Sequence, residues 1–338
     1  MGRGEDQRYG SGTGAPVAEQ LLGGGLLFCD ARFHDLNGVP SGARRWYDHR
    51  GREGTLVGVL SGVVTDGVLL SGHSAPFGGP DLVREDPTVD DVVGLVREGL
   101  ARARADGLRE VRIRCRPPEY SAAEPLVEYA LLQAGFAVEH CDLNQVVDLR
   151  GLGPDTDPLS LLSRKRARDV RADLALPYEL TEAVHDEEIA VAQGILAANR
   201  AAHGRPPGLP AGYLARAREA FPGRVHVWVL RHDGRPVAAA VVYRVLSDVD
   251  LLVAWGDDAA HGLQRSPMNL LAHRLVETSL RTGARLLDMG PSSEKDGSPN
   301  LGLAHFKRSV GARPGTRKVL VTSLVRPGAD VSGAPPGP

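Results

Sequence analysis

The strand and helix patterns of this chain occur in nearly the same order twice, which constrains its fold more than any other feature. In the first half, apolar runs and helical periods predict a hairpin around Ser61-Gly62, a helix, a strand, a second helix and further strands, at residues 56–70, 89–106, 111–115, 122–134 and 136–149. The second half predicts two helices, a hairpin around Asp233-Gly234, a strand, a helix and two strands, at residues 189–202, 212–220, 225–245, 251–255, 269–281, 286–289 and 319–324. The repeated order indicates a mixed α/β (α+β) fold that arose by internal duplication.

A stretch rich in glycine, proline and aspartate at residues 151–158 separates the halves and is typical of a linker. The chain has 338 residues, a length that suits two domains better than one core. We therefore expect one domain at residues 17–150 and another at 159–325, each a mostly antiparallel, twisted sheet flanked by helices. Residues 1–16 and 326–338 have the composition of disordered tails.

Composition excludes several classes of protein. Apolar residues make up 42% of the chain and charged residues 24%, values typical of a globular protein with a sizeable core. The formal net charge is −2, so nucleic acid could be bound only by a local basic patch. No apolar run approaches the ~18 residues that span a bilayer, and residues 1–16 lack the apolar segment of a signal peptide. We expect a cytoplasmic protein with no membrane partner.

Cysteine and histidine positions give no indication of a metal or a disulfide. Cys29, Cys115 and Cys141 are an odd number without a Cys-x-x-Cys spacing, which argues for free thiols in a reducing compartment. The histidines are scattered and lack the His-x₃-His spacing of a zinc site. We expect no metal and no resident cofactor.

A concentrated basic segment follows the linker at residues 163–171. If it is helical, Arg164, Arg168 and Arg171 share one face. Such a stripe is either a solvated helix face or a patch that binds phosphates, and the sequence leaves both interpretations open.

The segment with the densest set of side chains suited to catalysis or binding lies near the C-terminus. The apolar strand at 286–289 leads through Asp288 and Gly290 into a polar turn with Ser293, Glu294 and Asn300, and Phe306-Lys307 follows on a short helical segment. Ligand sites of open α/β sheets are built at strand ends of this kind. We therefore place the candidate site here.

The segment resembles the closing signature of the FemAB-like branch of the GNAT acyltransferases. In that family an Asp-apolar-Gly turn, here 288–290, is followed by Phe-Lys-x-x-apolar-Gly, here 306–311. The loop at 74–80, with Ser74, Phe77 and a Gly-Gly pair, is similar to a loop of the family's first domain. The resemblance covers most of the ordered chain and implies two GNAT-like domains and an acyl transfer to an amine.

The resemblance, together with the chemistry of the side chains, suggests roles for individual residues. Lys307 would stabilise the oxyanion formed when an amine attacks the activated acyl group, and Phe306 would lie at the acyl end of the donor. Asp288 and Glu294 are candidates for the base that deprotonates the attacking ammonium, although Asp288 could instead cap the turn and Glu294 could be a solvated acid. Donor contacts are expected from Asn300, Arg164, Arg168 and Arg171, and acceptor contacts from Ser74, Phe77 and Ser293.

The residues before the predicted helix at 269–281 bear on the identity of the acyl donor. Acetyl-CoA-dependent GNAT proteins hold the pyrophosphate on backbone amides of a glycine-patterned loop before a helix. The matching residues here, 261–267, lack that pattern, and Pro267 removes an amide donor. Characterised FemAB-like enzymes use aminoacyl-tRNA, which we favour, with a small soluble amine as acceptor, such as one in antibiotic or other secondary-metabolite biosynthesis. Acyl-CoA-dependent N-acyltransfer and a non-catalytic GNAT-like binding protein are the alternatives.

Overall fold

The computed structural model of the chain describes residues 24–206, 208–258 and 260–325. In this part of the chain one 12-stranded sheet runs in the order β1-β2-β3-β5-β12-β6-β11-β10-β9-β8-β7, with β4 paired to β2. The pairs β3–β5 and β10–β11 are parallel and the others are antiparallel. The strands are β1 (Arg44–Arg50), β2 (Leu56–Thr65), β3 (Val68–Ser71), β4 (Pro80–Leu82), β5 (Glu110–Arg114), β6 (Ala137–Asp148), β7 (Tyr178–Glu182), β8 (Val225–His232), β9 (Arg235–Leu246), β10 (Val249–Asp257), β11 (Leu286–Pro291) and β12 (Arg313–Ser323).

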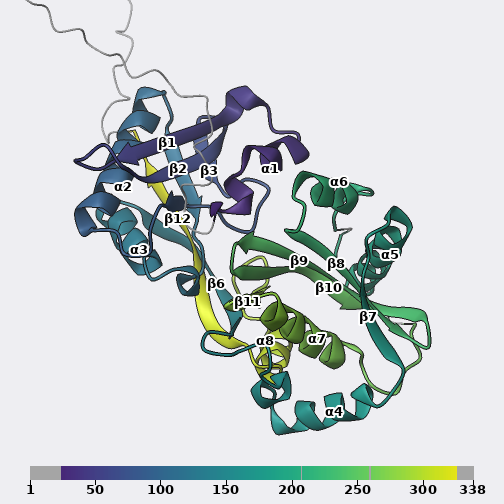
Figure 1. The fold of residues 1–338 in the computed structure, drawn as a ribbon. Coiled ribbons are helices and arrows are strands. Elements are labelled where there is room, and N and C mark those ends of the chain that lie inside the picture. Colours follow the sequence, from purple (N-terminus) through teal and green to yellow (C-terminus); the bar gives the residue numbers. More distant parts are fainter. Residues whose placement is uncertain (1–23, 207, 259, 326–338) are drawn as a thin grey trace, which may run out of the picture.

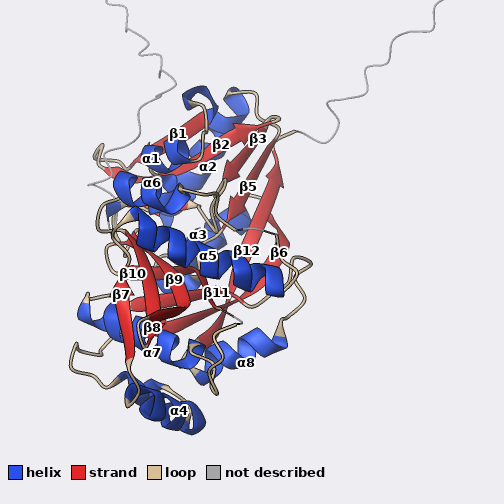
Figure 2. Cartoon of the chain, turned by 90° about the vertical axis from the view of Figure 1, so that its right-hand side faces the viewer, coloured by secondary structure: helices blue, strands red, loops and turns tan. Residues whose placement is uncertain are grey.

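Helices cover both halves of this sheet (Figure 1). The α-helices of the described residues are α1 (Ala31–Leu36), α2 (Val89–Ala105), α3 (Glu124–Gln133), α4 (Arg164–Leu174), α5 (Asp186–Ala202), α6 (Tyr213–Ala220), α7 (Met268–Arg281) and α8 (Leu301–Ser309). Helices α2 and α3 share a core with the N-terminal strands, while α5 and α7 pack on opposite faces of the C-terminal strands. Helix α4 lies at the far end of the C-terminal half, as the two views in Figures 1 and 2 agree.

Local sequence signals explain several element boundaries. Helix α2 begins after Thr88, whose hydroxyl accepts from the Asp91 amide at 3.2 Å while the Asp91 carboxylate accepts from the Thr88 amide at 3.3 Å. The predicted hairpin at Asp233-Gly234 is confirmed, with φ of 49° and 75° at the two turn residues. Both boundaries depend on contacts within a few residues, which is why the sequence predicts them.

The other predicted turn, at Ser61-Gly62, is wrong. Both residues lie inside β2, and the chain turns instead at Asp66-Gly67, with φ of 50° and 74°. Gly62 is needed in the strand for packing, because a Cβ there would lie 2.9 Å from the Leu70 carbonyl oxygen. A glycine in a strand can mark a close approach as well as a turn.

The mixed α/β class and the mostly antiparallel pairing are confirmed, but the two halves do not form separate sheets. Strand β12 comes from the C-terminal part of the chain and pairs with β5 on one side and β6 on the other. Strand β6 in turn pairs with β11 and so joins the halves. A boundary at residues 151–158 therefore stays a prediction, since β12 pairs with strands of the first half. The predicted tails lie outside the described residues.

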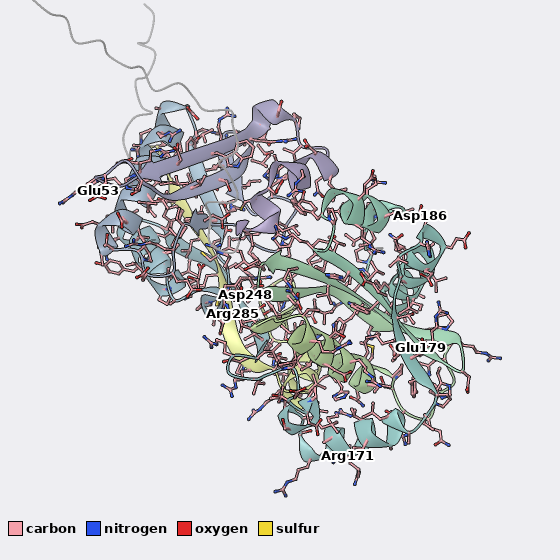
Figure 3. The ribbon with its side chains drawn as sticks, in the orientation of Figure 1. Glu53, Arg171, Glu179, Asp186, Asp248 and Arg285 are labelled. Carbon is pink, nitrogen blue, oxygen red and sulfur yellow. The ribbon has the colours of Figure 1, made fainter. Side chains whose placement is uncertain are left out.

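Side chains from both halves also share one core. Phe28 lies 6.2 Å from Tyr243 between ring centroids, and both belong to an apolar cluster that includes Phe77 and Tyr120. Arg285 pairs with Asp248 at 2.7 Å and donates to the carbonyls of Glu119 and Tyr120; Figure 3 shows Arg285 and Asp248 together near the centre of the molecule. No helix in the described part of the chain is long and apolar enough to cross a membrane.

Candidate active site

The site begins where the parallel strands β10 and β11 part. They pair through only three residue pairs, 249–251 with 286–288. Beyond Asp288 the strand bends: Gly290 takes a φ of 75°, and Pro291 then pairs with Asn144 of β6 across an irregular register. Strand β10 continues to Asp257, so the two strands diverge toward their carboxyl ends, where open sheets bind ligands.

Asp288 holds this bend in place. Its carboxylate is fully buried and accepts three hydrogen bonds, from Tyr120 Oη at 2.9 Å, Asn144 Nδ2 at 2.9 Å and the Gly290 amide at 2.7 Å. Burial, followed by the Asp288 charge, raises the pKa of Tyr120 well above its ordinary value, so the phenol remains a donor. With three donors and no exposed surface, Asp288 positions the turn. Of the two roles that the sequence left open for Asp288, general base or cap of the turn, this geometry favours the cap.

Lys307 is buried beside the same bend. Only 2% of its surface is exposed, and Nζ donates to the carbonyl oxygens of Gly290 at 2.9 Å and Pro291 at 2.8 Å. Burial lowers the pKa of Lys307 to about 7; Asp288 opposes the shift and Arg317 adds to it. The sequence suggested a lysine beside the Asp288 turn, and the structure brings the two together.

The loop between β11 and α8 carries the other predicted polar residues. Asn300 caps α8 by accepting from the Leu303 amide at 3.0 Å and donates to Glu294 Oε1 at 2.6 Å. Ser293 Oγ accepts from the Leu143 amide at 2.7 Å, which ties the loop to β6. Glu294 is exposed and lies 3.7 Å from Arg205 of the loop after α5. Glu294 is thus the accessible carboxylate of the site, and Asn300 and Ser293 fix the loop that presents it.

Phe306 connects the site to the basic helix. The centroid of its ring lies 5.5 Å from that of Trp255, so the aromatic side chains of α8 and β10 contact each other. Arg166 of α4 lies 5.9 Å from the Phe306 ring and donates to Ser309 Oγ at 3.1 Å, which packs the start of α4 on α8.

The predicted stripe lies on this helix and faces solvent. Arg164, Arg168 and Arg171 are all exposed, and Figure 3 shows Arg171 directed away from the body of the protein. Among the described residues only Arg168 of the three has a carboxylate within reach, Asp169 at 4.0 Å. Helix α4 is fixed at its other end by Arg265, which pairs with Asp173 at 2.6 Å. The stripe is therefore an exposed surface on a helix that is anchored at both ends.

The predicted acceptor loop divides into exposed and buried parts. Ser74 is exposed at a positive φ of 55°. Phe77 is completely buried, packed edge-on against Phe28 at 5.4 Å and Tyr120 at 5.2 Å between centroids. Its place in the core leaves no surface for a ligand, so the structure gives Phe77 a packing role instead of the expected acceptor contact.

Residues that support the site from the first half were missed. Tyr120 and Asn144 lie more than 140 positions before Asp288 in the sequence and follow no recognisable motif. No group of three His, Cys, Asp or Glu side chains in the described residues is arranged to hold a metal ion. The three cysteines are free thiols.

Comparison with known proteins agrees with this architecture. Residues 162–308 match the family model described as an acetyltransferase (GNAT) domain. The structure described as FemX superposes with a TM-score of 0.62 at 12% identity, covering 86% of this chain and 91% of that one. Residues 162–308 therefore form a GNAT domain, and the whole chain shares the fold of FemX.

Two further solved structures share the fold. One is L-PGS from Bacillus licheniformis, with a TM-score of 0.53 and 13% identity over 86% of this chain and 91% of that one. The other is the C-terminal domain of a putative lysylphosphatidylglycerol synthetase from Agrobacterium fabrum, with a TM-score of 0.51 and 14% identity over 82% and 84% of the chains. None of the curated proteins matches this chain. The chain is an acyltransferase of the GNAT type.

Proposed function

We propose that this acyltransferase joins an activated acyl group to the amine of a small molecule, with aminoacyl-tRNA as the donor. The observation that carries the proposal is the buried Lys307, held at the point where β10 and β11 diverge. A fixed cation in a water-poor site stabilises an oxyanion far better than a solvated one. The acyl carbonyl would enter between the diverging strands, with Phe306 and Trp255 as its apolar walls.

The reaction balances without a cofactor. The nitrogen of the acceptor attacks the acyl carbonyl, a C–N bond forms, and the C–O bond to the tRNA ribose breaks, which releases its hydroxyl. The attacking ammonium loses two protons in all: Glu294, the exposed carboxylate of the site, receives one, and the other passes to the ribose oxygen as it leaves. Lys307 supports the negative charge on the carbonyl oxygen, while Asp288 acts through the turn and through its charge, which favours the protonated lysine.

The α4 surface supports tRNA as the donor. Arg164, Arg168 and Arg171 are exposed on one helix, and that helix packs on the segment that carries Phe306 and Lys307. At the helix where other GNAT proteins bind pyrophosphate, Pro267 precedes α7 and has no amide hydrogen to donate. One structural neighbour is named as a putative lysylphosphatidylglycerol synthetase, and its lysyl product is that of an aminoacyl transfer. Together these features favour an aminoacyl donor over a CoA thioester.

The test compares two donors. Purified protein is incubated with charged total tRNA or with acetyl-CoA, and binding and donor consumption are measured. We expect consumption of charged tRNA that is abolished by RNase and weakens steeply with salt, because phosphate contacts release counterions. The triple variant Arg164→Ala, Arg168→Ala, Arg171→Ala should raise the apparent KM for charged tRNA by a larger factor than it lowers kcat. Lys165→Ala, on the same helix, is the matched control.

The acyl-CoA alternative has one specific observation in its favour. The matching family model is described as an acetyltransferase domain. Activity that is supported by acetyl-CoA alone and unaffected by RNase would replace the aminoacyl donor with a thioester. Lys307 and the diverging strands would keep their roles, since both donors form the same oxyanion.

A further inference from the structure

A cleft of about 560 Å³ lies next to the candidate active site. Its walls come from β5, β6 and β12 and from the loop after β11, with Pro76 at one edge. It reaches the site through Pro291, whose carbonyl oxygen accepts from Lys307 at 2.8 Å. Its volume is in the range of small-molecule sites, about 300–1,000 Å³.

Most charges in this cleft are already paired. Arg112 is paired with Glu139 at 2.8 Å, and Lys318 with Glu128 at 2.5 Å. These two cations are neutralised by carboxylates of the protein, so neither offers a full charge to a ligand.

Three cations of the cleft retain capacity for an anion. In the described part of the chain, Arg114 and Lys295 have no carboxylate within 4.0 Å, and Arg114 donates only to the Ala75 carbonyl, at 3.0 Å. Arg317 pairs with Asp142 at 2.9 Å through Nη2, but its Nη1 is buried without a hydrogen-bond partner. A buried donor without a partner is costly, and a bound anion would satisfy it.

The distance of these cations from Pro291, at the edge of the candidate active site, follows from the register of the strands. Pro291, Asn144 and Gly315 form one row across β11, β6 and β12. Arg317 lies two residues farther along β12, and Val319, which pairs with Arg114, lies two residues beyond that. At about 3.3 Å per residue, the cations lie roughly 7 to 13 Å from the Pro291 row. Lys295 joins them, because its loop packs against His140, the partner of Val319: a Cβ on Gly297 would lie 3.1 Å from the His140 ring.

We infer that this cleft binds the acyl acceptor, and that the acceptor carries a carboxylate or phosphate group at the end opposite its reacting amine. The inference rests on the proposed function. Glu294 lines the cleft near Pro291 and attracts the ammonium end of such a molecule, while Arg114, Lys295 and Arg317 hold the anionic end. Charge of both signs is thus placed to fix the direction in which the acceptor enters.

The experiment uses three amines that share the ammonium end and differ in the far group: 6-aminohexanoate, 6-aminohexyl phosphate and 6-aminohexanamide, whose far group is neutral. Binding to the full chain is measured by calorimetry at low and moderate salt. We expect at least one anionic amine to bind, more weakly as salt rises, and the amide not to bind. Comparing the dissociation constants of 6-aminohexanoate and 6-aminohexyl phosphate shows whether the cleft prefers a carboxylate or a phosphate as the far group.

Variants locate the binding. Arg114→Gln with Lys295→Gln should raise the dissociation constant about fivefold to tenfold, because two exposed charge contacts are lost. Lys318→Gln in the same cleft should change it little, since Glu128 already neutralises that lysine. Arg281→Gln, exposed at the end of α7, is the control outside the cleft. Folding of each variant is checked by its melting temperature.

Binding and catalysis can fail separately. Lys307→Met should still bind the anionic amine although its turnover falls. A parent protein that binds the amine but consumes neither donor contradicts the proposed function and not the cleft. Equal binding of all three amines, or no binding of any, would overturn the inference. It would also be overturned if the Arg114 and Lys295 variants lost affinity for tRNA and kept affinity for the amines.

Discussion

Replacing Lys307 by methionine separates the charge of this residue from its packing. Methionine keeps an unbranched apolar stem, while the donors to the carbonyls of Gly290 and Pro291 are lost. If the ammonium supports the oxyanion, turnover should fall by about 10²–10³, the loss seen when one oxyanion donor is removed. Binding of the donor should change much less, since the charge develops only during the reaction.

The stability of the variant follows from the pKa of the lysine. Folding lowers that pKa from 10.5 to about 7. Each unit corresponds to about 1.4 kcal/mol, so holding the charged lysine at pH 7 costs the fold roughly 4–5 kcal/mol. Leaving the carbonyls without a donor costs about 1–3 kcal/mol. The methionine variant should therefore be at least as stable as the parent at pH 7.

The pH dependence gives a second measure. Between pH 7 and 10.5 the unfolded chain holds the lysine proton and the folded chain does not, so the parent gains stability as pH rises. From pH 7 to 9 the gain is about 2 kcal/mol, and the variant lacks it. Urea unfolding of both proteins at several pH values measures the difference, in which all other titrating groups cancel. Near-full turnover of a folded variant would remove Lys307 from the site, and a stability difference independent of pH would contradict its lowered pKa.

Two further predictions concern the same turn. The turnover of the parent divided by that of Lys307→Met should fall as pH rises through about 7, because the lysine of the parent loses its charge. The titration of the amine acceptor affects both proteins equally and cancels in this ratio. A ratio that rises with pH would instead make Lys307 the general base. Tyr120→Phe removes the donor 2.9 Å from Asp288 and should destabilise the protein by about 1–3 kcal/mol in thermal or urea unfolding, whereas Tyr129→Phe, on an exposed tyrosine, should not. Equal effects of the two tyrosine variants would show that the Asp288 contact contributes nothing.

The sequence predicted the elements that local contacts determine. Helix α2 has its cap, β8 and β9 have a turn that needs two positive φ angles, and α7 follows Pro267. Strand β1 was missed because it is a strand at the edge of the sheet, rich in charged residues, and the apolar alternation that marks a strand is weak there. The sheet order was not predictable either, because the place of β12 between β5 and β6 depends on pairing across about 170 to 210 residues.

The candidate site shows the same division between local and distant contacts. The order of Asp288, Glu294, Asn300 and Lys307 along one segment could be predicted from the sequence. The structure brings Lys307 to the bend after Asp288 and joins Asn300 to Glu294 in the loop that follows. The burial of Lys307 could not be predicted from the sequence, since lysine is among the residues least often buried. Nor could the core position of Phe77, which depends on Phe28 and Tyr120, residues distant in sequence.

The bend after Asp288 depends on both halves of the chain at once. Tyr120 and Asn144 from the first half hold the carboxylate, the carboxylate holds the Gly290 amide, and the carbonyls of Gly290 and Pro291 then face Lys307. Removing the first half would leave a buried carboxylate with one donor in place of three, a strongly unfavourable arrangement. The GNAT domain matched at residues 162–308 therefore depends on the preceding residues for the geometry of its own lysine. The first half thus supplies structural support to the single site that we assign, and it need not carry a second one.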